Sequence, residues 1–154
     1  DTAVSGDVSV SAIFSDDPDG DGITNTVEGS APNSGDGNND GTADNTQDNV
    51  SSLVNSVTGK YATLAVDDAC TISSVNNNQA SSSDTYTYPM GLMDFTLTCD
   101  SAGQSTQITI YYQENNSSDY TPRKYNSSSK TYQTIDGAQT STVTIGGKSA
   151  TKVT

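Results

Sequence analysis

Histidine and tryptophan are absent from the chain, and basic residues are scarce, with six lysines and arginines against nineteen acidic residues. Without histidine, the sequence lacks the side chain used most often as a general base and as a nitrogen ligand of transition metals. No nucleophile stands beside a base, and four carboxylates of the second half show no spacing typical of a glycosidase pair: Asp94, Asp100, Glu114 and Asp119. The composition therefore indicates a protein that is not an enzyme.

The scarcity of basic residues is most marked at the start of the chain. Residues 1–48 contain eleven of the nineteen acidic side chains and no lysine or arginine, and the first basic residue is Lys60. Residues 49–154 carry eight acidic and six basic side chains, although the whole chain has a formal charge of −13. Such an anionic segment repels nucleic acid and favours divalent cations as partners.

Long hydrophobic runs are also absent, so the sequence predicts no membrane span. Hydrophobic residues make up 31% of the chain, which is enough for a lean core in one domain of this length. A composition rich in serine, threonine and asparagine is typical of secreted β-rich proteins. We therefore expect an extracellular or cell-surface location, with the numbering starting at a mature N-terminus.

Only two cysteines are present, Cys70 and Cys99. An even number in such a composition favours a disulfide, and a buried pair of free thiols is the alternative. A bridge between them would contribute about 3–4 kcal/mol of stability in the chain-entropy model.

The most specific motif is Asp17-Pro-Asp-Gly-Asp-Gly-Ile-Thr-Asn-Thr-Val-Glu28, which matches the calcium loop D-x-[DN]-x-[DN]-G-x5-E at every specified position. Calcium takes six to eight oxygen ligands, and the glycine at the sixth position, here Gly22, permits the sharp turn. We expect the seventh residue to ligate through its carbonyl, the ninth directly or through water, and the twelfth through two oxygens. The predicted ligands are Asp17, Asp19, Asp21, Ile23, Asn25 and Glu28.

A weaker copy of this loop follows 19 residues later, with Gly41 at the sixth position and Gln47 where the glutamate would stand. Losing that carboxylate should weaken or reshape the site. The alternative for both loops is a flexible linker rich in aspartate, asparagine and glycine. The predicted ligands of the second loop are Asp36, Asn38, Asp40, Thr42 and Asp44.

Residues 49–154 show short runs of alternating apolar and polar residues, the pattern of half-buried antiparallel strands. The sequence predicts an all-β fold, an antiparallel two-sheet sandwich that is preceded by an Asp/Gly-rich calcium-binding segment at residues 16–48. A short helix could form near Asp48–Val54. Strands are expected at Tyr61–Val66, Cys70–Val75, Thr85–Tyr88, Met93–Cys99, Gln107–Tyr112, Lys130–Ile135, Thr142–Ile145 and Ala150–Val153.

Five tyrosines of the second half stand near charged side chains and could form a carbohydrate-binding platform. We favour simple packing of these rings on sheet faces, because tyrosine is a common strand residue. The residues concerned are Tyr111, Tyr112, Tyr120, Tyr125 and Tyr132, around Asp119, Arg123 and Lys124.

Residues 1–15 are interpreted as a separate N-terminal strand. From Val8 to Phe14, apolar side chains stand at every second position and form one apolar face. The segment could pair within its own domain, or it could fill a groove in a neighbouring copy as a donated strand. The sequence favours neither arrangement. The face consists of Val8, Val10, Ala12 and Phe14, which alternate with Ser9, Ser11 and Ile13.

Several stretches together resemble the bacterial choice-of-anchor U domain. Gly35–Leu53 followed by Tyr61–Ala65 is similar to the opening of that domain, Tyr88–Thr98 to its central strand motif, and Val143–Thr154 to its penultimate part. The loop Asp17–Glu28 also resembles thrombospondin type 3 calcium repeats. The resemblance implies a surface-exposed or secreted bacterial module without known catalysis, and the cysteine pair is not part of the family pattern.

The same family pattern continues with an Asp/Gly-rich tail and another strand. Either that tail is absent or processed, or another segment supplies the final strand of the sandwich. We therefore expect a non-enzymatic structural protein that binds calcium and assembles by strand donation into a homopolymeric surface fibre or filament. The alternative is an adhesin-like surface module that binds a glycan or protein ligand.

Overall fold

The computed structural model describes residues 16–80 and 85–154. Strands make up 40% of the molecule and helices 8%, and the sheets are antiparallel, which confirms the predicted all-β fold. The interpretation of residues 1–15 as a strand lies outside the described residues. None of the helices in the described part of the chain has the length and apolar character needed to cross a membrane.

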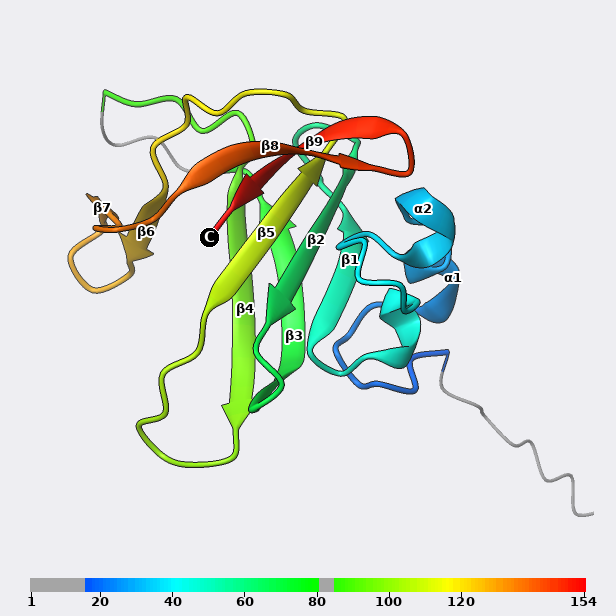
Figure 1. Ribbon diagram of the computed structural model, residues 1–154. Helices are drawn as coiled ribbons and strands as arrows, with labels where there is room; N and C mark the ends of the chain where they lie inside the picture. Colours follow the sequence, from blue (N-terminus) through cyan, green and yellow to red (C-terminus); the bar gives the residue numbers. More distant parts are fainter. Residues whose placement is uncertain (1–15, 81–84) are drawn as a thin grey trace, which may run out of the picture.

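The main layer is a five-stranded sheet with the strand order β1-β2-β5-β9-β8 (Figure 1). Every neighbouring pair in it is antiparallel. Alternation of side chains puts Leu64 of β2 on the face that forms the core. The strands are β1 (Val50–Val54), β2 (Tyr61–Val66), β5 (Ile108–Gln113), β8 (Thr140–Ile145) and β9 (Lys148–Val153).

The second layer is a single hairpin of β3 (Cys70–Asn78) and β4 (Leu92–Cys99), which crosses behind β2 and β5 in Figure 1. Apolar side chains of the two layers meet between the sheets and form one hydrophobic core. Its buried members are Leu53, Leu64, Val66, Cys70, Ile72 and Val75.

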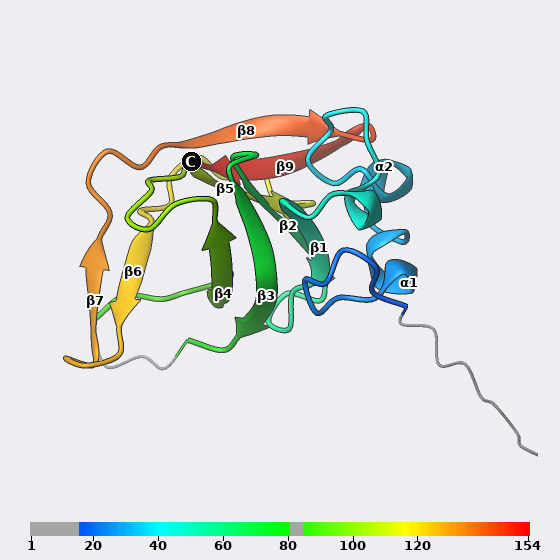
Figure 2. The ribbon, with the colours of Figure 1, turned by 90° about the horizontal axis from the view of Figure 1, so that it is seen from below.

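A third, smaller hairpin joins β6 (Arg123–Asn126) to β7 (Thr131–Thr134). Both views place it at the opposite end of the molecule from α1 (Figures 1 and 2). The sequence predicted β7 but not β6. The polar run of β6 has no alternation of apolar residues that would mark it as a strand.

The acidic segment is folded against the edge of the main sheet, beside β1 (Figures 1 and 2). It contains the short helices α1 (Asn25–Glu28) and α2 (Pro32–Gly35) and the 3-10 turn η1 (Asp44–Thr46). Asp16 is fixed to the first of these helices, because its carbonyl accepts a hydrogen bond of 2.6 Å from the amide of Asn25. An exposed sheet edge invites pairing with other chains, and this segment covers the edge at β1.

Two expected elements are wrong. The helix near Asp48–Val54 is instead the strand β1, in which Val50, Ser51 and Ser52 are all buried. A strand covered on both faces loses the alternation that would identify it. No strand is found at residues 85–88, where Tyr88 stacks on Tyr132 instead of joining a ladder.

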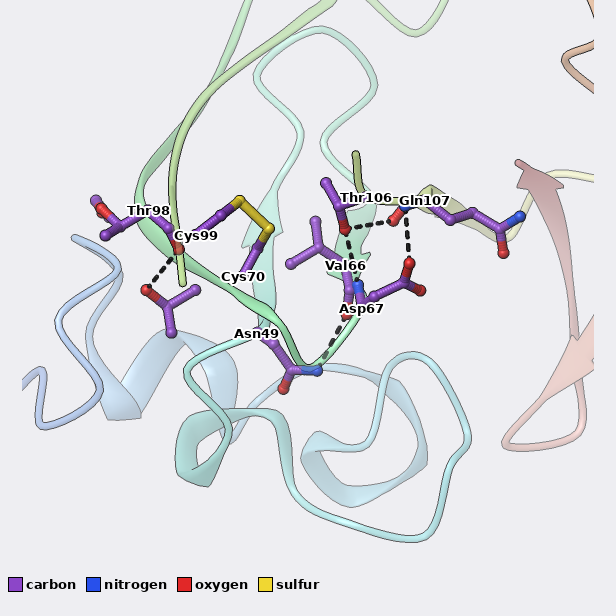
Figure 3. Close-up of a disulfide and its surroundings, with 10 residues drawn as sticks. Asn49, Val66, Asp67, Cys70, Thr98, Cys99, Thr106 and Gln107 are labelled. Carbon is purple, nitrogen blue, oxygen red and sulfur yellow. Dashed lines mark hydrogen bonds between the residues drawn. A yellow bond between two sulfur atoms is a disulfide. The ribbon is translucent and has the colours of Figure 1, made fainter. Parts of the chain in front are cut away.

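The disulfide between Cys70 and Cys99 confirms the predicted bridge, and the alternative of free thiols is wrong (Figure 3). The two residues are direct partners across β3 and β4, with their Cα atoms 4.0 Å apart. Nearby, Asp67 accepts a hydrogen bond of 2.9 Å from the amide of Gln107, which ties the turn before β3 to the start of β5 (Figure 3). The disulfide indicates a non-cytoplasmic environment.

Candidate metal centre

The loop Asp17–Glu28 is wrapped around its first carboxylate. Asp17 accepts hydrogen bonds from the amides of Gly20 at 2.9 Å and Gly22 at 3.1 Å. Gly22 has a φ of +90°, a conformation that glycine adopts readily. The seventh residue, Ile23, packs its side chain against the hydrophobic core. The loop is therefore anchored to the sandwich.

Three carboxylates of this loop converge. Asp17, Asp19 and Asp21 each offer an oxygen, and these oxygens lie within 4.8 Å of one another. Asp21 is fully buried, and so is Glu28 at the twelfth position. Such a cluster can hold a metal ion, because a hard cation takes oxygen ligands and offsets the repulsion between the carboxylates.

Buried oxygens without hydrogen bonds identify where a cation would fit. Within residues 16–80 and 85–154, five such oxygens belong to this loop: both of Asp19, Oδ2 of Asp21, Oδ1 of Asn25 and Oε2 of Glu28. Leaving a buried acceptor unpaired costs about 1–3 kcal/mol, and more when it is charged. All four residues are among the predicted ligands, so the loop offers an oxygen-only donor set that suits a hard cation.

The carboxylates of Asp19, Asp21 and Glu28 have raised pKa values, because burial disfavours their ionised forms and, among the described residues, no positive charge lies beside them to favour those forms. Burial raises the pKa of Glu28 to about 8, although the Ser52 amide donates a hydrogen bond of 3.1 Å to this carboxylate. The nearby charges of Asp21, Asp19 and Asp44 raise it further. Burial, and then the charge of Asp21, raises the pKa of Asp19 to about 6. Without a cation, these groups keep protons well above their ordinary range.

The second loop repeats the backbone of the first. The amide of Gly41 donates to Asp36 at 3.1 Å, and the amide of Thr42 donates to Asp40 at 2.8 Å. The first loop has the matching bonds, from Gly22 to Asp17 and from Ile23 to Asp21. Gly41 has a φ of +95°, close to that of Gly22. The two loops are therefore structural copies, as their spacing predicts.

The side chains of the second loop differ from those of the first. The amide nitrogen of Asn38 donates a hydrogen bond of 2.8 Å to Asp40, which is exposed. The amide nitrogen of Gln47 makes long contacts with Oδ1 of Asp40 (3.5 Å) and the carbonyl of Thr42 (3.4 Å). In the first loop, the equivalent oxygens are predicted cation ligands. A neutral hydrogen-bond donor thus faces the oxygens that calcium would need in the second loop.

Asp44, at the ninth position of the second loop, leaves the exposed part of that loop and enters the interior. Its Oδ2 accepts hydrogen bonds from the amide of Gly37 at 2.9 Å and the hydroxyl of Ser52 at 2.5 Å. The Ser52 hydroxyl also bonds Thr63 at 2.6 Å. Burial raises the pKa of Asp44 to about 6, and its Oδ1 is a further buried oxygen without a hydrogen bond among the described residues.

This network was not predicted from the sequence. Asp44 is bonded to Gly37 and to Ser52 of β1, and Thr63 of β2 bonds that same serine. Gln113 of β5 donates a hydrogen bond of 2.7 Å to the carbonyl of Gly37. The one signal in the sequence is the polar pair Ser51-Ser52 between the apolar residues of β1. A polar pair in a buried strand indicates a polar partner beyond it.

The tyrosines do not form one platform. Tyr125 packs on Tyr132 with the ring centres 4.9 Å apart. Tyr111 lies instead beside Lys152 of β9, with the ammonium 5.7 Å from its ring centre. Tyr112, Tyr120 and Tyr125 line a groove that also contains apolar residues of β4 and β5. The tyrosine rings thus lie on several different surfaces of the molecule.

Comparison of the chain with protein-family models, with curated proteins and with solved structures gives no match. Membership of the choice-of-anchor U domain family therefore stays a prediction from the motifs described above.

Proposed function

We propose that the protein is a non-enzymatic, extracellular structural module that binds calcium in the loop Asp17–Glu28 and forms the subunit of a surface filament. The observation that carries the calcium site is the set of five buried, unpaired oxygens in this loop. Calcium is favoured over magnesium because magnesium retains several waters and rarely occupies a site made wholly of protein oxygens.

Binding at this loop would stabilise more than the loop itself. Glu28 accepts a hydrogen bond from the amide of Ser52 in β1, and the carbonyl of Val27 accepts one of 2.8 Å from the Tyr61 hydroxyl of β2. Ile23 packs against the core between the two layers. A cation that fixes this loop therefore stabilises the edge of the main sheet.

The filament is supported by composition and by sheet architecture. The acidic segment makes the uncomplexed chain self-repelling, and divalent cations remove this obstacle to assembly. Assembly by strand donation needs an apolar strand and a sheet edge to receive it, and the segment Val4–Phe14 has the required alternation. An adhesin-like module is the second candidate, because tyrosines line a groove in which a glycan or protein ligand could bind.

The calcium proposal is tested by thermal unfolding with calcium and with excess chelator. With about 1 mM calcium and a dissociation constant of about 0.1 mM, one site adds about 1.4 kcal/mol to the free energy of unfolding. Glu28→Gln should remove most of this gain. The matched control is Glu114→Gln, which changes the exposed second glutamate of the chain and should keep the gain. Equal melting temperatures with calcium and with chelator would show that the proposal is wrong.

A further inference from the structure

We propose that the outer edge of β4 and the adjoining face of β5 form an acceptor groove, which receives the strand Val4–Phe14 of a second copy of this chain. The inference rests on the proposed filament and names the surface through which the subunits join.

The groove has a volume of about 1250 Å³. Met93 and Phe95 of β4 line one side, Ile108 and Ile110 of β5 line the floor, and Val153 of β9 lies beyond them. Small-molecule pockets measure about 300–1,000 Å³, so the groove is large for a small ligand. Residues of β4, β5, β6 and β9 line it together with the loops at 86–91, 119–122 and 135–139, and the two long strands β4 and β5 give it a side and a floor along which an extended peptide can lie.

The described part of the chain covers β5 only in part. β5 is the central strand of the five-stranded sheet, but Ile108 and Ile110 are only half-buried. On the neighbouring strand β2, Leu64 is 0% exposed. Among residues 16–80 and 85–154, the second layer consists of β3 and β4, which are too narrow to cover the whole face of the main sheet. One further strand beside β4 would complete the cover.

The backbone amides and carbonyls on the outer edge of β4 can form hydrogen bonds with such a strand. Within residues 16–80 and 85–154, it pairs only with β3 and has no strand on its other side. An unpaired edge is a template for strand addition, in which main-chain hydrogen bonds give affinity and alternate side chains fill pockets. The groove therefore combines an open edge with an apolar floor.

The occupant follows from length and pattern. β4 has eight residues, which extend about 26 Å, and Val8–Phe14 extends about 23 Å. In an extended conformation, four apolar side chains of this segment would share one face, and serines occupy two of the three positions between them. The apolar face can lie on Ile108 and Ile110, and the serines can face water.

A second copy is favoured over the same chain because of where Asp16 lies. Its carbonyl accepts a hydrogen bond from Asn25 of α1, and Figures 1 and 2 place α1 at the opposite end of the molecule from the β6–β7 hairpin that borders the groove. The two residues from Phe14 to Asp16 span at most about 7 Å. Repeated head to tail, a contact of this kind builds a filament when its rotation does not close into a ring, and the proposed filament requires the open case.

The first test alters one face of the segment. Val10→Asp puts a charge into the apolar groove and should reduce the polymerised fraction at least about tenfold. Ser9→Asp adds the same charge to the opposite face and should leave the fraction unchanged. Sedimentation and electron microscopy in calcium measure both variants. Equal polymerisation of the two variants would overturn the proposal.

The second test locates the groove by disulfide trapping between two differently tagged chains. Ala12→Cys in one chain and Met93→Cys in the other should give a linked dimer in at least about tenfold higher yield than Ser11→Cys with Met93→Cys, because Ser11 is on the other face. When both substitutions are in one chain, a bond within that chain would overturn the choice of a second copy. If no disulfide forms between the segment and the groove, or if a glycan displaces the segment from it, the assignment of the groove as the acceptor site is wrong.

The two proposals fail separately. Loss of the trapped dimer with a normal calcium gain in melting temperature would reject the groove and leave the calcium site intact. A trapped dimer that forms while calcium leaves the melting temperature unchanged would reject the calcium site and support the groove.

Discussion

Glu28 links the candidate metal centre to the sheet. One of its oxygens accepts the Ser52 amide of β1, and the other is buried without a hydrogen bond among the described residues. A single carboxylate thus accepts the hydrogen bond of a backbone amide in the edge strand β1 and retains its other oxygen for a cation. This arrangement explains why removing the cation should affect the sheet as well as the loop.

The raised pKa of Glu28 predicts the pH dependence of the metal-free protein. An unfolded chain releases this proton near the ordinary pKa of 4.5, whereas the folded chain holds it up to about pH 8. Without metal, the free energy of unfolding should therefore fall as pH rises from about 4.5 to 8. Saturating calcium should remove this fall, because the cation takes the place of the proton.

Urea unfolding at several pH values between 5 and 8, with chelator and with calcium, measures this effect. Glu28→Gln should flatten the pH dependence in chelator above about pH 6, whereas Asp19 and Asp44, whose pKa values burial raises to about 6, still contribute to the fall below it. A metal-free stability that stays level or rises over this range would contradict the assignment.

Gln47 predicts a difference between the two loops. Its amide nitrogen faces Asp40 and the carbonyl of Thr42, where a glutamate would complete a calcium loop. Gln47→Glu should therefore add a second site and raise the calcium stoichiometry from one to two per chain. Asp48→Glu places the new glutamate one residue later as a control, without adding charge, and should leave the stoichiometry at one.

Isothermal titration of the metal-free protein with calcium measures the number of sites. Unchanged stoichiometry in Gln47→Glu would show that the glutamine is not what weakens the second loop.

At the scale of elements, the hairpin of β3 and β4 forms the second layer of the described structure and is closed by the disulfide. Replacing Cys70 and Cys99 together with alanine removes a bridge between residues 29 apart in sequence. The free energy of unfolding should fall by about 3–4 kcal/mol in the chain-entropy model. The control is the neighbouring cross-strand pair Thr71 and Thr98, whose double replacement with alanine should cost about 1 kcal/mol or less.

Denaturant unfolding compares the two double variants. Equal losses of stability would show that the bridge contributes no more than an ordinary pair of side chains across the strands.

Sequence reasoning identified the elements whose pattern is contained in one short, continuous stretch of residues. β2 has the predicted bounds Tyr61–Val66, because its apolar pattern stands between turns. The cluster of three aspartates in the first loop could be predicted because the spacing of its motif lies within twelve residues. β1 was misread because packing against the folded acidic segment buries both of its faces and removes the alternation of a half-buried strand. The network around Asp44 depends on Ser52 and Thr63, which only the fold brings together.

At the scale of the whole molecule, the acidic segment and the β6–β7 hairpin lie at opposite ends of one sandwich (Figures 1 and 2), and residues of that hairpin border the groove. The pattern of the sequence was sufficient for the all-β fold, the disulfide and the acidic cluster. The width of the second layer could not be predicted, because strand pairing between distant segments depends on tertiary packing. That width decides which face of the main sheet is left half-covered.

The attachment of Asp16 to α1 has a mechanical consequence. Tension applied through the first fifteen residues enters the body at Asp16, which is bonded to Asn25 and to the hydroxyl of Thr26. The pull then passes along the loop Asp17–Glu28 before it reaches the sheet. Calcium in this loop should raise the force at which the molecule yields in single-molecule pulling, and Glu28→Gln should yield at the metal-free force even in calcium. Equal forces with calcium and with chelator would show that the loop bears none of the pull. In the proposed filament, the calcium concentration of the surrounding medium would then set the tensile strength.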